Sequence, residues 1–522
     1  MADYKHVVLL GIDGAGAYYT KTDTPNIDRI FKGGALTYRM RVTSPTSSAH
    51  SWGSCFHGCL TEHHGIVEND YVENNPYPKS AYHYPSFFKV IKEHYPEREV
   101  GVIYSWPGIT GLVENDAGIT MVKLNDTAAA RYAIDEYIPE KKPTSLYIYF
   151  GSTDGTGHIH GYGSPEHLKQ ITYVDGLVGE IYDAVEKAGM LDDTLFMVVS
   201  DHGGIRRGHG GLTDEEKYAI FAAAGKTVEC GEPVDMEIRD VAAIALYALG
   251  IDKPSTYTAR VPRGVFCGVG NSERHEYHDP KSPRYHLPTK TRDTRAFALA
   301  NIDKPLLRYA SFDNSTEPFI PCGDIKYLDG YFGKCVKLDD GFLTLNGVDI
   351  DRRSVTLAAF IKTPSPYMDS PIFANKPCQD FDEVRREDLI NGFVVNCMRN
   401  TYVIPPVHTV RLELVSGGRP TLLEAVLPGD YQYGWVHLAI VLDRIEGRAS
   451  IYLDFKCAAT MSVPWLKMNA SLSDAGTTLA VGQDSTGEYR FKFGLSVDEL
   501  LLFDGALTDG DITALGSYYR EQ

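Results

Sequence analysis

The sequence predicts an α/β domain followed by an all-β domain, and three observations support this order. Short apolar runs alternate with amphipathic, helix-like segments through the first half of the chain, which is typical of a parallel sheet with helices on both faces. From about residue 309 helical periodicity disappears, and short alternating runs recur between turn signals, as in a β-sandwich. The length of 522 residues is sufficient for two or more such domains.

The α/β domain is predicted to cover residues 1–268. We expect buried strands at 6–12, 100–106, 145–152 and 195–201. Each is a short, nearly continuous apolar run, as expected of a strand that is covered on both faces. We expect helices at 24–34, 85–95, 127–138, 165–189 and 239–250. The predicted fold is therefore a doubly wound, mostly parallel sheet.

Residues 269–308 are predicted to form a linker or an inserted loop, because they are polar, contain prolines and lack periodicity. Their histidines, His275, His278 and His286, fit a solvated linker better than a metal site. The second domain is predicted at 309–522. Its strands are expected within 334–340, 354–363, 392–398, 409–418, 434–443, 448–456 and 498–505.

Composition excludes several classes of function. The net charge is −18, from 51 basic and 69 acidic residues, and no basic stripe is present, so nucleic-acid binding through phosphates is disfavoured.

No apolar run reaches about 18 residues, so we expect no membrane span. The first apolar run is too short for a signal peptide. The nine cysteines form no CxxC pair, which favours a reduced, cytoplasmic chain.

Acidic and histidine side chains gather just after three of the predicted strands. These residues are Asp13, Asp154, His158, Asp201, His202 and His209. Because ligands of open α/β sheets bind at the carboxyl ends of the strands, we expect the six side chains to converge. Three carboxylates and three imidazoles suit Zn²⁺ or a similar transition metal better than Mg²⁺ or Ca²⁺ alone, and they are enough for two ions. One such residue alone would more simply be a helix cap or a loop residue.

A cluster of hydroxyl side chains between residues 43 and 48 contains a potential nucleophile. A hydroxyl that starts a helix beside two metal ions would lose its proton readily and attack phosphorus. The residues alone do not distinguish this role from that of turn and cap residues, which Thr43, Ser44, Thr46 and Ser47 fit equally well.

Several motifs together carry a family resemblance. They are GIDG (11–14), TPN (24–26), PTSS (45–48), HGIVEN (64–69), SWPG (105–108), DGTGH (154–158), SDHGG (200–204) and HGG (209–211). In this order they resemble the alkaline phosphatase superfamily, and most closely its nucleotide pyrophosphatase/phosphodiesterase branch. The resemblance spans nearly all of 1–268 and implies an alkaline phosphatase-like fold that hydrolyses phosphate esters with two divalent metal ions, Zn²⁺ ahead of Mn²⁺.

The resemblance also implies roles for individual residues. Ser48 matches the nucleophile, which also contacts one metal, and Asn69 matches a residue that binds a non-bridging phosphoryl oxygen. The ligands implied for the first metal are Asp13, Asp201 and His202, and those implied for the second are Asp154, His158 and His209. Two departures stand out: Ser48 replaces the usual threonine, and His209 follows SDHGG much more closely than in the nucleotide enzymes.

The predicted activity is hydrolysis of a small-molecule or glycan-linked phosphate ester, with a diester favoured and a phosphoseryl intermediate on Ser48. A phosphomonoesterase is an alternative, because Arg206 and Arg207 lie near the site in sequence and could bind a dianion. A phosphotransferase is another alternative. A sulfatase is disfavoured because the C/S-x-P-x-R motif is missing.

The second domain resembles a laminin-G/concanavalin-like jelly roll. The resemblance rests on 330–345, 434–455 and 495–515. It implies a scaffold, or a surface for homo-oligomer formation, ahead of glycan binding. A different class of function is an inactive catalytic fold that presents a glycan-binding sandwich. The chain disfavours it, because all seven matched positions retain groups that can bind a metal.

Overall fold

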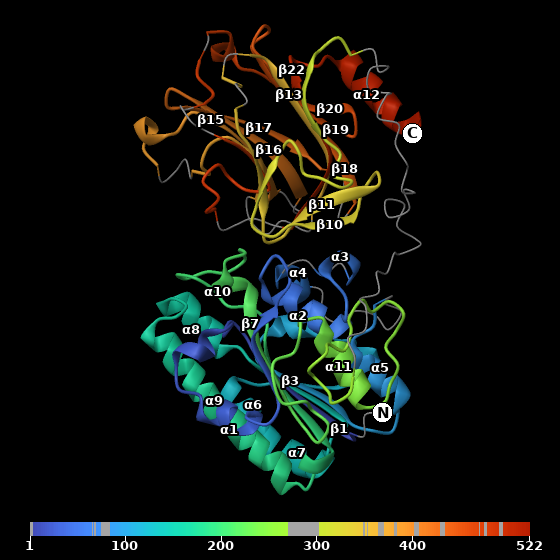
Figure 1. The fold of residues 1–522 in the computed structure, drawn as a ribbon. Helices are drawn as coiled ribbons and strands as arrows, with labels where there is room; N and C mark the ends of the chain where they lie inside the picture. Colours follow the sequence, from blue (N-terminus) through green and yellow to red (C-terminus); the bar gives the residue numbers. More distant parts are fainter. Residues whose placement is uncertain are drawn as a thin grey trace. The chain divides into compact units, whose positions relative to one another are not determined.

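The protein is described from a computed structural model, which divides the chain into two compact units, Met1–Tyr277 and His278–Gln522 (Figure 1). The structure describes residues 4–64, 66, 69–74, 84–269, 302–347, 350–351, 353–363, 370–379, 384–400, 407–427, 434–468, 470–473, 478–489 and 494–521. The histidines predicted to lie in the linker are outside these residues.

The first unit is built on a seven-stranded sheet. Its strands are β1 (His6–Ile12), β2 (Ala35–Arg41), β3 (Val100–Tyr104), β4 (Thr120–Lys123), β5 (Ser145–Phe150), β6 (Thr194–Ser200) and β7 (Tyr218–Ala224), in the order β2-β7-β6-β1-β5-β3-β4. Neighbours from β6 to β4 are parallel, whereas β7 is antiparallel to both β6 and β2. The prediction of a mostly parallel sheet is therefore confirmed, with an antiparallel arm at one edge that was not predicted.

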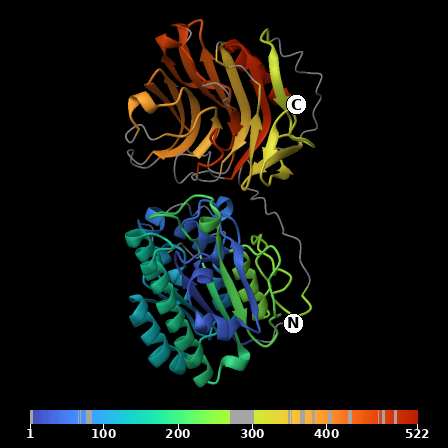
Figure 2. The same ribbon diagram turned by 60° about the vertical axis from the view of Figure 1, so that its left-hand side comes forward.

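Helices cover both faces of this sheet (Figures 1 and 2). They are α1 (Pro25–Phe31), α2 (Ser48–His57), α3 (Thr61–His64), α4 (Asn69–Asn74), α5 (Phe87–His94), α6 (Asp126–Tyr132), α7 (Ile138–Lys141), α8 (Ser152–His160), α9 (Pro165–Lys187), α10 (Asp214–Lys217) and α11 (Asp240–Ala248). Short 3-10 turns are η1 (Tyr18–Lys21), η2 (Pro107–Gly111), η3 (Asn115–Ala117) and η5 (Leu191–Asp193), and a π turn, η4 (Ala133–Tyr137), joins α6 to α7.

Alternate residues of the central strand pack into two different cores. Val7 and Leu9 lie with side chains of α2, α5 and α11, while Val8 and Leu10 lie with side chains of α1, α6, α7 and α9. Because both faces are covered, β1 is buried from Val7 to Ile12, which explains its continuous apolar sequence. The long helix α9 begins with Pro165 after Ser164, whose side chain accepts a hydrogen bond from the amide of His167.

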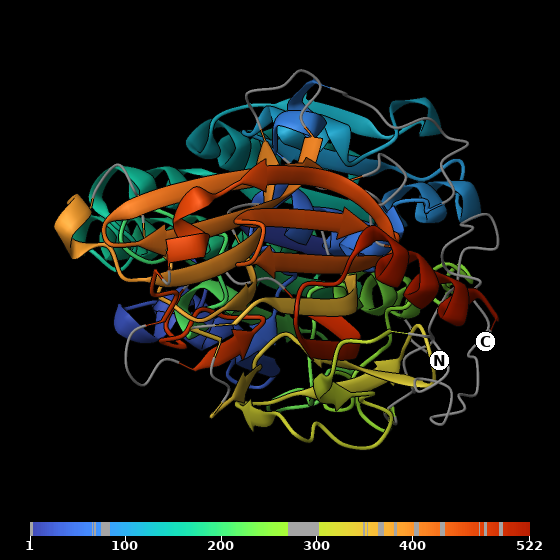
Figure 3. The ribbon, with the colours of Figure 1, turned by 90° about the horizontal axis from the view of Figure 1, so that it is seen from above.

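The second unit consists mainly of two antiparallel sheets, viewed from above in Figure 3. One has the order β10-β11-β22-β13-β18-β19-β20, with β8 also paired to β22, and the other β17-β16-β15-β14-β21-β12-β9. The strands are β8 (Leu306–Ala310), β9 (Ile320–Cys322), β10 (Lys326–Asp329), β11 (Lys334–Leu338), β12 (Phe342–Leu345), β13 (Val355–Lys362), β14 (Ser370–Ala374), β15 (Gly392–Asn400), β16 (Val407–Ser416), β17 (Arg419–Val426), β18 (Trp435–Asp443), β19 (Arg448–Leu453), β20 (Lys456–Ser462), β21 (Leu479–Val481) and β22 (Leu495–Asp504). The 3-10 turns are η7 (Arg386–Asp388) and η8 (Pro464–Met468).

Residues of both sheets share one apolar core, consistent with the predicted sandwich. Two details differ from the expectation. Helix α12 (Asp509–Glu521) ends the chain and packs through Leu515 and Tyr519 against the outer side chains of β13 and β18, so the unit is not all-β. Strand β8 begins at Leu306, inside the range assigned to the linker. The jelly-roll topology stays a prediction. Among the described residues, no helix is both long and apolar enough to span a membrane.

Candidate active site

The sheet brings the predicted ligands to one edge. Strands β5 and β6 flank β1 in parallel, so their carboxyl ends lie side by side. Asp13 directly follows β1 and Asp201 directly follows β6. Helix α8 begins after β5 and carries Asp154 and His158 four residues apart, hence on one helical face.

The imidazole of His202 lies at the centre of one group of ligands. Its Nε2 is 3.5 Å from Asp13 Oδ1 and 3.4 Å from Asp201 Oδ2. The same nitrogen lies 3.2 Å from Ser48 Oγ. The nucleophile implied by the family resemblance therefore lies beside the three residues that it was expected to share a metal with.

Asp154 is the centre of the second group. His158 Nε2 lies 3.3 Å from its Oδ2, and His209 Nε2 lies 3.9 Å from its Oδ1. Two sets of ligand atoms lie close enough to hold an ion: Asp154 with His158 and His209, and Asp13 with Asp154 and His202. Asp154 is thus placed between the two sets, a position that the sequence did not suggest.

All three histidines are oriented in the same way. Nδ1 of His202 is 2.9 Å from the Gly203 carbonyl, that of His158 is 3.0 Å from the Arg207 carbonyl, and that of His209 is 2.8 Å from the Thr46 carbonyl. A carbonyl oxygen only accepts, so Nδ1 is the donor in each ring and Nε2 is the nitrogen that faces the site. This is the arrangement that metal-binding histidines adopt.

The carboxylates are held by donors on one oxygen only. Tyr149 and Trp52 donate to Asp13 Oδ2, at 2.5 and 3.2 Å. Asp201 Oδ1 accepts the amides of Gly14 and His202, at 3.1 and 2.9 Å. The other oxygens, Asp13 Oδ1 and Asp201 Oδ2, are buried and accept no hydrogen bond among the described residues. Buried oxygens of this kind are typical of a site that binds a cation.

The electrostatics of the cluster also favour bound cations. Burial and the nearby Asp154 raise the pKa of Asp13 to about 6, and burial together with Asp13 raises the pKa of Asp201. For Asp154 burial acts upward, but the histidines around it outweigh burial and lower its pKa. Three carboxylates and three imidazoles whose Nε2 atoms face the site form a donor set that fits two divalent transition-metal ions.

Ser48 is the first residue of α2, where the helix dipole favours an anion. Asn69 lies at the same helix end: its Oδ1 accepts the Ala49 amide at 2.9 Å and the Ser47 hydroxyl at 3.2 Å. Because Oδ1 is the acceptor here, the Asn69 amide nitrogen is the atom that remains to donate to a ligand.

Sequence reasoning missed the residues that support the ligands. The sequence indicates only a turn or cap role for Thr46, yet its carbonyl accepts from His209, and its hydroxyl contacts Gly210 N at 3.0 Å and Gly211 O at 2.8 Å. Tyr162 donates to Asp154 Oδ1 at 2.5 Å. No sequence signal marks such residues, since their partners lie up to 165 positions away.

The first unit is also similar in sequence to known proteins. Residues 7–207 match the family model for type I phosphodiesterase / nucleotide pyrophosphatase. The first unit is therefore similar to the phosphodiesterases and nucleotide pyrophosphatases of this family over most of its sheet. The match ends just before His209, the last of the predicted ligands.

Among similar proteins, human ectonucleotide pyrophosphatase/phosphodiesterase family member 7 is 25% identical over 242 residues, 41% of this chain and 52% of that protein. The mouse bis(5′-adenosyl)-triphosphatase is 23% identical over 212 residues, 38% of this chain and 46% of the relative. The chain thus spans about half the length of each. The solved structure of murine ectonucleotide pyrophosphatase/phosphodiesterase 5 aligns with a TM-score of 0.39 at 15% identity, covering 48% of this chain and 96% of that one.

Proposed function

We propose that this protein is a two-metal phosphodiesterase that works through a phosphoseryl intermediate on Ser48. The observation that carries the proposal is the position of Ser48 Oγ, 3.2 Å from His202 Nε2 and at the N-terminus of α2. A hydroxyl at this place is presented to a ligand cluster with two unpaired carboxylate oxygens.

Asp13, Asp201 and His202 would hold one divalent ion, and Asp154, His158 and His209 the other. Bound there, two such ions lower the pKa of a coordinated hydroxyl and neutralise charge on phosphoryl oxygens. Ser48 Oγ then attacks phosphorus, and the bond from phosphorus to the leaving oxygen breaks. The leaving alcohol takes a proton, and water hydrolyses the phosphoseryl ester and restores the Ser48 hydroxyl.

Asn69 supports a diester as substrate. A diester carries one negative charge less than a monoester, so an uncharged N–H donor matches its non-bridging oxygen. The relatives named phosphodiesterase and pyrophosphatase are consistent with this preference. The substrate we propose is a small-molecule or glycan-linked phosphodiester.

A phosphomonoesterase is the second function to test, because of the turn that carries Arg206 and Arg207. Ile205 and Gly208 exchange backbone hydrogen bonds of 2.9 and 3.1 Å, so the two arginines form the tip of a tight turn and are exposed. The Arg207 carbonyl holds His158. This places two cations next to a ligand, where they could bind a dianionic phosphate.

Hydrolysis of bis-p-nitrophenyl phosphate and p-nitrophenyl phosphate, with metal content measured on the same sample, tests both functions. We expect a zinc-loaded enzyme that prefers the diester and loses about 10³-fold or more in kcat with Ser48→Ala. Ser51→Ala is the matched control: this buried serine lies one turn further along α2 and bonds Thr43 at 3.0 Å. Equal activity of wild type and Ser48→Ala would refute the phosphoseryl pathway. Preference for the monoester that disappears in Arg206→Gln/Arg207→Gln would establish the second function instead.

For the second unit we propose a laminin-G/concanavalin-like jelly roll that mediates self-association. Strand β17 is an edge strand with exposed apolar side chains, Leu422 and Val426, and such edges invite pairing with another chain. Light scattering of the full chain should show an oligomer that dissociates in Val426→Lys. A monomeric wild type would refute the proposal.

A further inference from the structure

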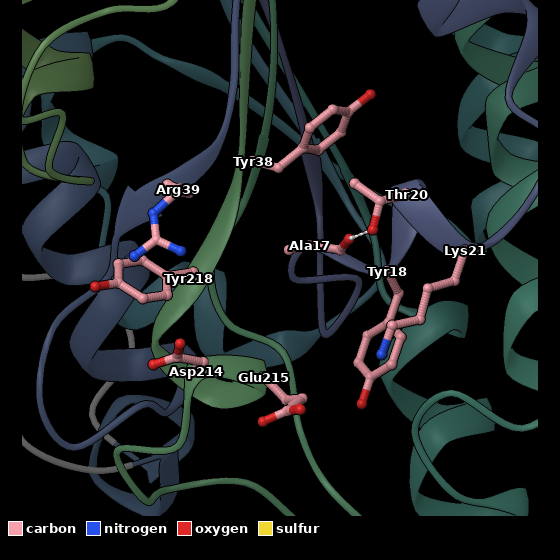
Figure 4. Close-up of a pocket in the computed structure, with 9 residues that line it drawn as sticks. All are labelled: Ala17, Tyr18, Thr20, Lys21, Tyr38, Arg39, Asp214, Glu215 and Tyr218. Carbon is pink, nitrogen blue, oxygen red and sulfur yellow. Dashed lines mark hydrogen bonds between the residues drawn. The ribbon is translucent and has the colours of Figure 1, made fainter.

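The first unit contains a hollow that no predicted role uses. It has a volume of about 170 Å³ and lies among η1, β2, α10 and β7 (Figure 4). Its lining residues are Ala17, Tyr18, Thr20, Lys21, Tyr38, Arg39, Asp214, Glu215 and Tyr218. None of them is a predicted metal ligand. The hollow adjoins the catalytic loops, because the Tyr18 hydroxyl donates to the Gly204 carbonyl at 2.7 Å, two residues after His202.

Two cations lie on opposite sides of this hollow, each over a tyrosine ring (Figure 4). Arg39 Cζ is 4.2 Å from the Tyr218 ring centroid, and Lys21 Nζ is 4.8 Å from that of Tyr18. Stacking on a ring restricts a long side chain but leaves the guanidinium edge and the ammonium hydrogens available. Within the described part of the chain, no carboxylate forms an ion pair with either cation.

The backbone fixes the position of Arg39. Strand β2 is an edge strand, and its register with β7 shifts between Thr37 and Met40, which marks a β-bulge. The Arg39 amide donates to the Thr37 hydroxyl at 3.0 Å within this bulge. Bulges redirect side chains and are frequent beside binding sites, so the stacking of Arg39 on Tyr218 is specified by the fold.

The remaining polar groups favour hydroxyl-bearing ligands. The Asp214 carboxylate is paired with Lys217 at 2.9 Å, which leaves Glu215 as the carboxylate that accepts hydrogen bonds from a ligand. The half-buried Tyr38 ring adds an apolar wall. The hollow is open to solvent on one side and accepts a single ring with its substituents.

We propose that this hollow binds an anionic monosaccharide, a single sugar ring that carries one carboxylate, phosphate or sulfate group. Arg39 binds the anionic group, and Lys21 on the opposite side donates to hydroxyl oxygens of the ring. The Tyr38 ring contacts the apolar face of the sugar, and Glu215 accepts its hydroxyl hydrogens. The site is separate from the metal centre and does not depend on the proposed phosphodiesterase activity.

The test is an NMR titration of the metal-loaded full chain with three probes: glucuronate, which has ring and anion, glucose, which has only the ring, and acetate, which has only the anion. Glucuronate is no phosphate ester, so turnover does not interfere. We expect it to bind at least tenfold more tightly than glucose or acetate. Arg39→Gln and Lys21→Gln should each weaken binding about tenfold or more, the cost of a charge-assisted hydrogen bond.

Two controls locate the binding. Arg131→Gln removes an exposed arginine of α6 that pairs with Glu180, and it should leave glucuronate affinity unchanged. Ser48→Ala should also leave it unchanged, because the metal centre is not the site. The proposal is overturned if glucuronate does not bind, if both Arg39→Gln and Lys21→Gln bind it like wild type with unaltered melting temperatures, or if Ser48→Ala abolishes binding. Acetate binding as tightly as glucuronate would overturn the assignment to a sugar.

Discussion

Replacing Thr46 by valine should weaken metal binding without touching a ligand. Thr46 is fully buried, and its hydroxyl bonds both Gly210 N and Gly211 O, next to His209. Valine has nearly the same shape but leaves that amide and that carbonyl unpaired. Each unpaired buried group costs about 1–3 kcal/mol, so the native position of the 209–211 loop is destabilised by about 2–6 kcal/mol. Movement of the loop towards water would relieve this cost.

Any such movement displaces the His209 imidazole, because its Nδ1 is held by the Thr46 carbonyl itself. Loss of an outer-shell partner typically costs 10–100-fold in metal affinity, equivalent to about 1.4–2.7 kcal/mol. This loss of binding free energy lies at the lower end of the destabilisation caused by the two unpaired groups. We therefore expect a 10–100-fold loss of affinity for the ion held by Asp154, His158 and His209.

The assay is competition for Zn²⁺ with a chromophoric chelator on the full chain, followed by diesterase activity at increasing zinc. Thr43→Val is the matched control, because this buried threonine lies in the same segment and bonds Ser51 rather than the His209 loop. We expect Thr46→Val to lose zinc affinity and to regain activity in excess zinc, and Thr43→Val to do neither. Zinc affinity within twofold of wild type in Thr46→Val would refute the reasoning.

Two further predictions concern the candidate active site and a third concerns the second unit. Gly14→Ala should abolish zinc retention, because φ is +68° there and the new Cβ would lie 2.7 Å from Asp154 Oδ1; Gly155→Ala, with open space around its Cβ, is the control for metal content. Asn69→Asp keeps an oxygen at the start of α2 but replaces the N–H donor, so kcat/KM for the diester should fall about 10²-fold, and an unchanged value would contradict the role. Burial lowers the pKa of His437 to about 3, below its value near 6.5 in the unfolded chain. The unfolded chain therefore binds more protons, and the free energy of unfolding falls as pH drops below 6.5, by about 2 kcal/mol at pH 5. In urea unfolding, His437→Phe should lose about 2 kcal/mol less of this free energy than wild type between pH 7 and pH 5.

The convergence of the ligands could be predicted because each lies just after a buried strand or at the start of the helix that follows it. A run such as residues 6–12 can be little other than an internal strand, and the carboxyl ends of parallel neighbours share one edge. Topology alone therefore places Asp13 near Asp201. It does not show that Asp154 contacts both groups, since that depends on where α8 starts and on the rotamer of one side chain.

The antiparallel edge could not be read in the same way. Strand β7 has the sequence YAIFAAA, and alanine is the best helix former. It is a strand because β6 and β2 pair with it on both sides, and this long-range pairing outweighs local propensity. The hollow beside β2 could not be predicted from the sequence either, because the β-bulge that presents Arg39 depends on the pairing of β2 with β7.

The chemistry of the site also bears on whether the catalytic fold has decayed into a scaffold. Asp13 and Asp201 are almost fully buried, and within the part of the chain that the structure describes each leaves one oxygen without a donor. An uncompensated buried carboxylate costs several kcal/mol, and replacing it by an apolar residue is often neutral or stabilising. Asp13 and Asp201 occur here together with Asp154 and with three histidines whose Nε2 atoms face these carboxylates, and this combination favours a site that is stabilised by bound cations over a decayed scaffold.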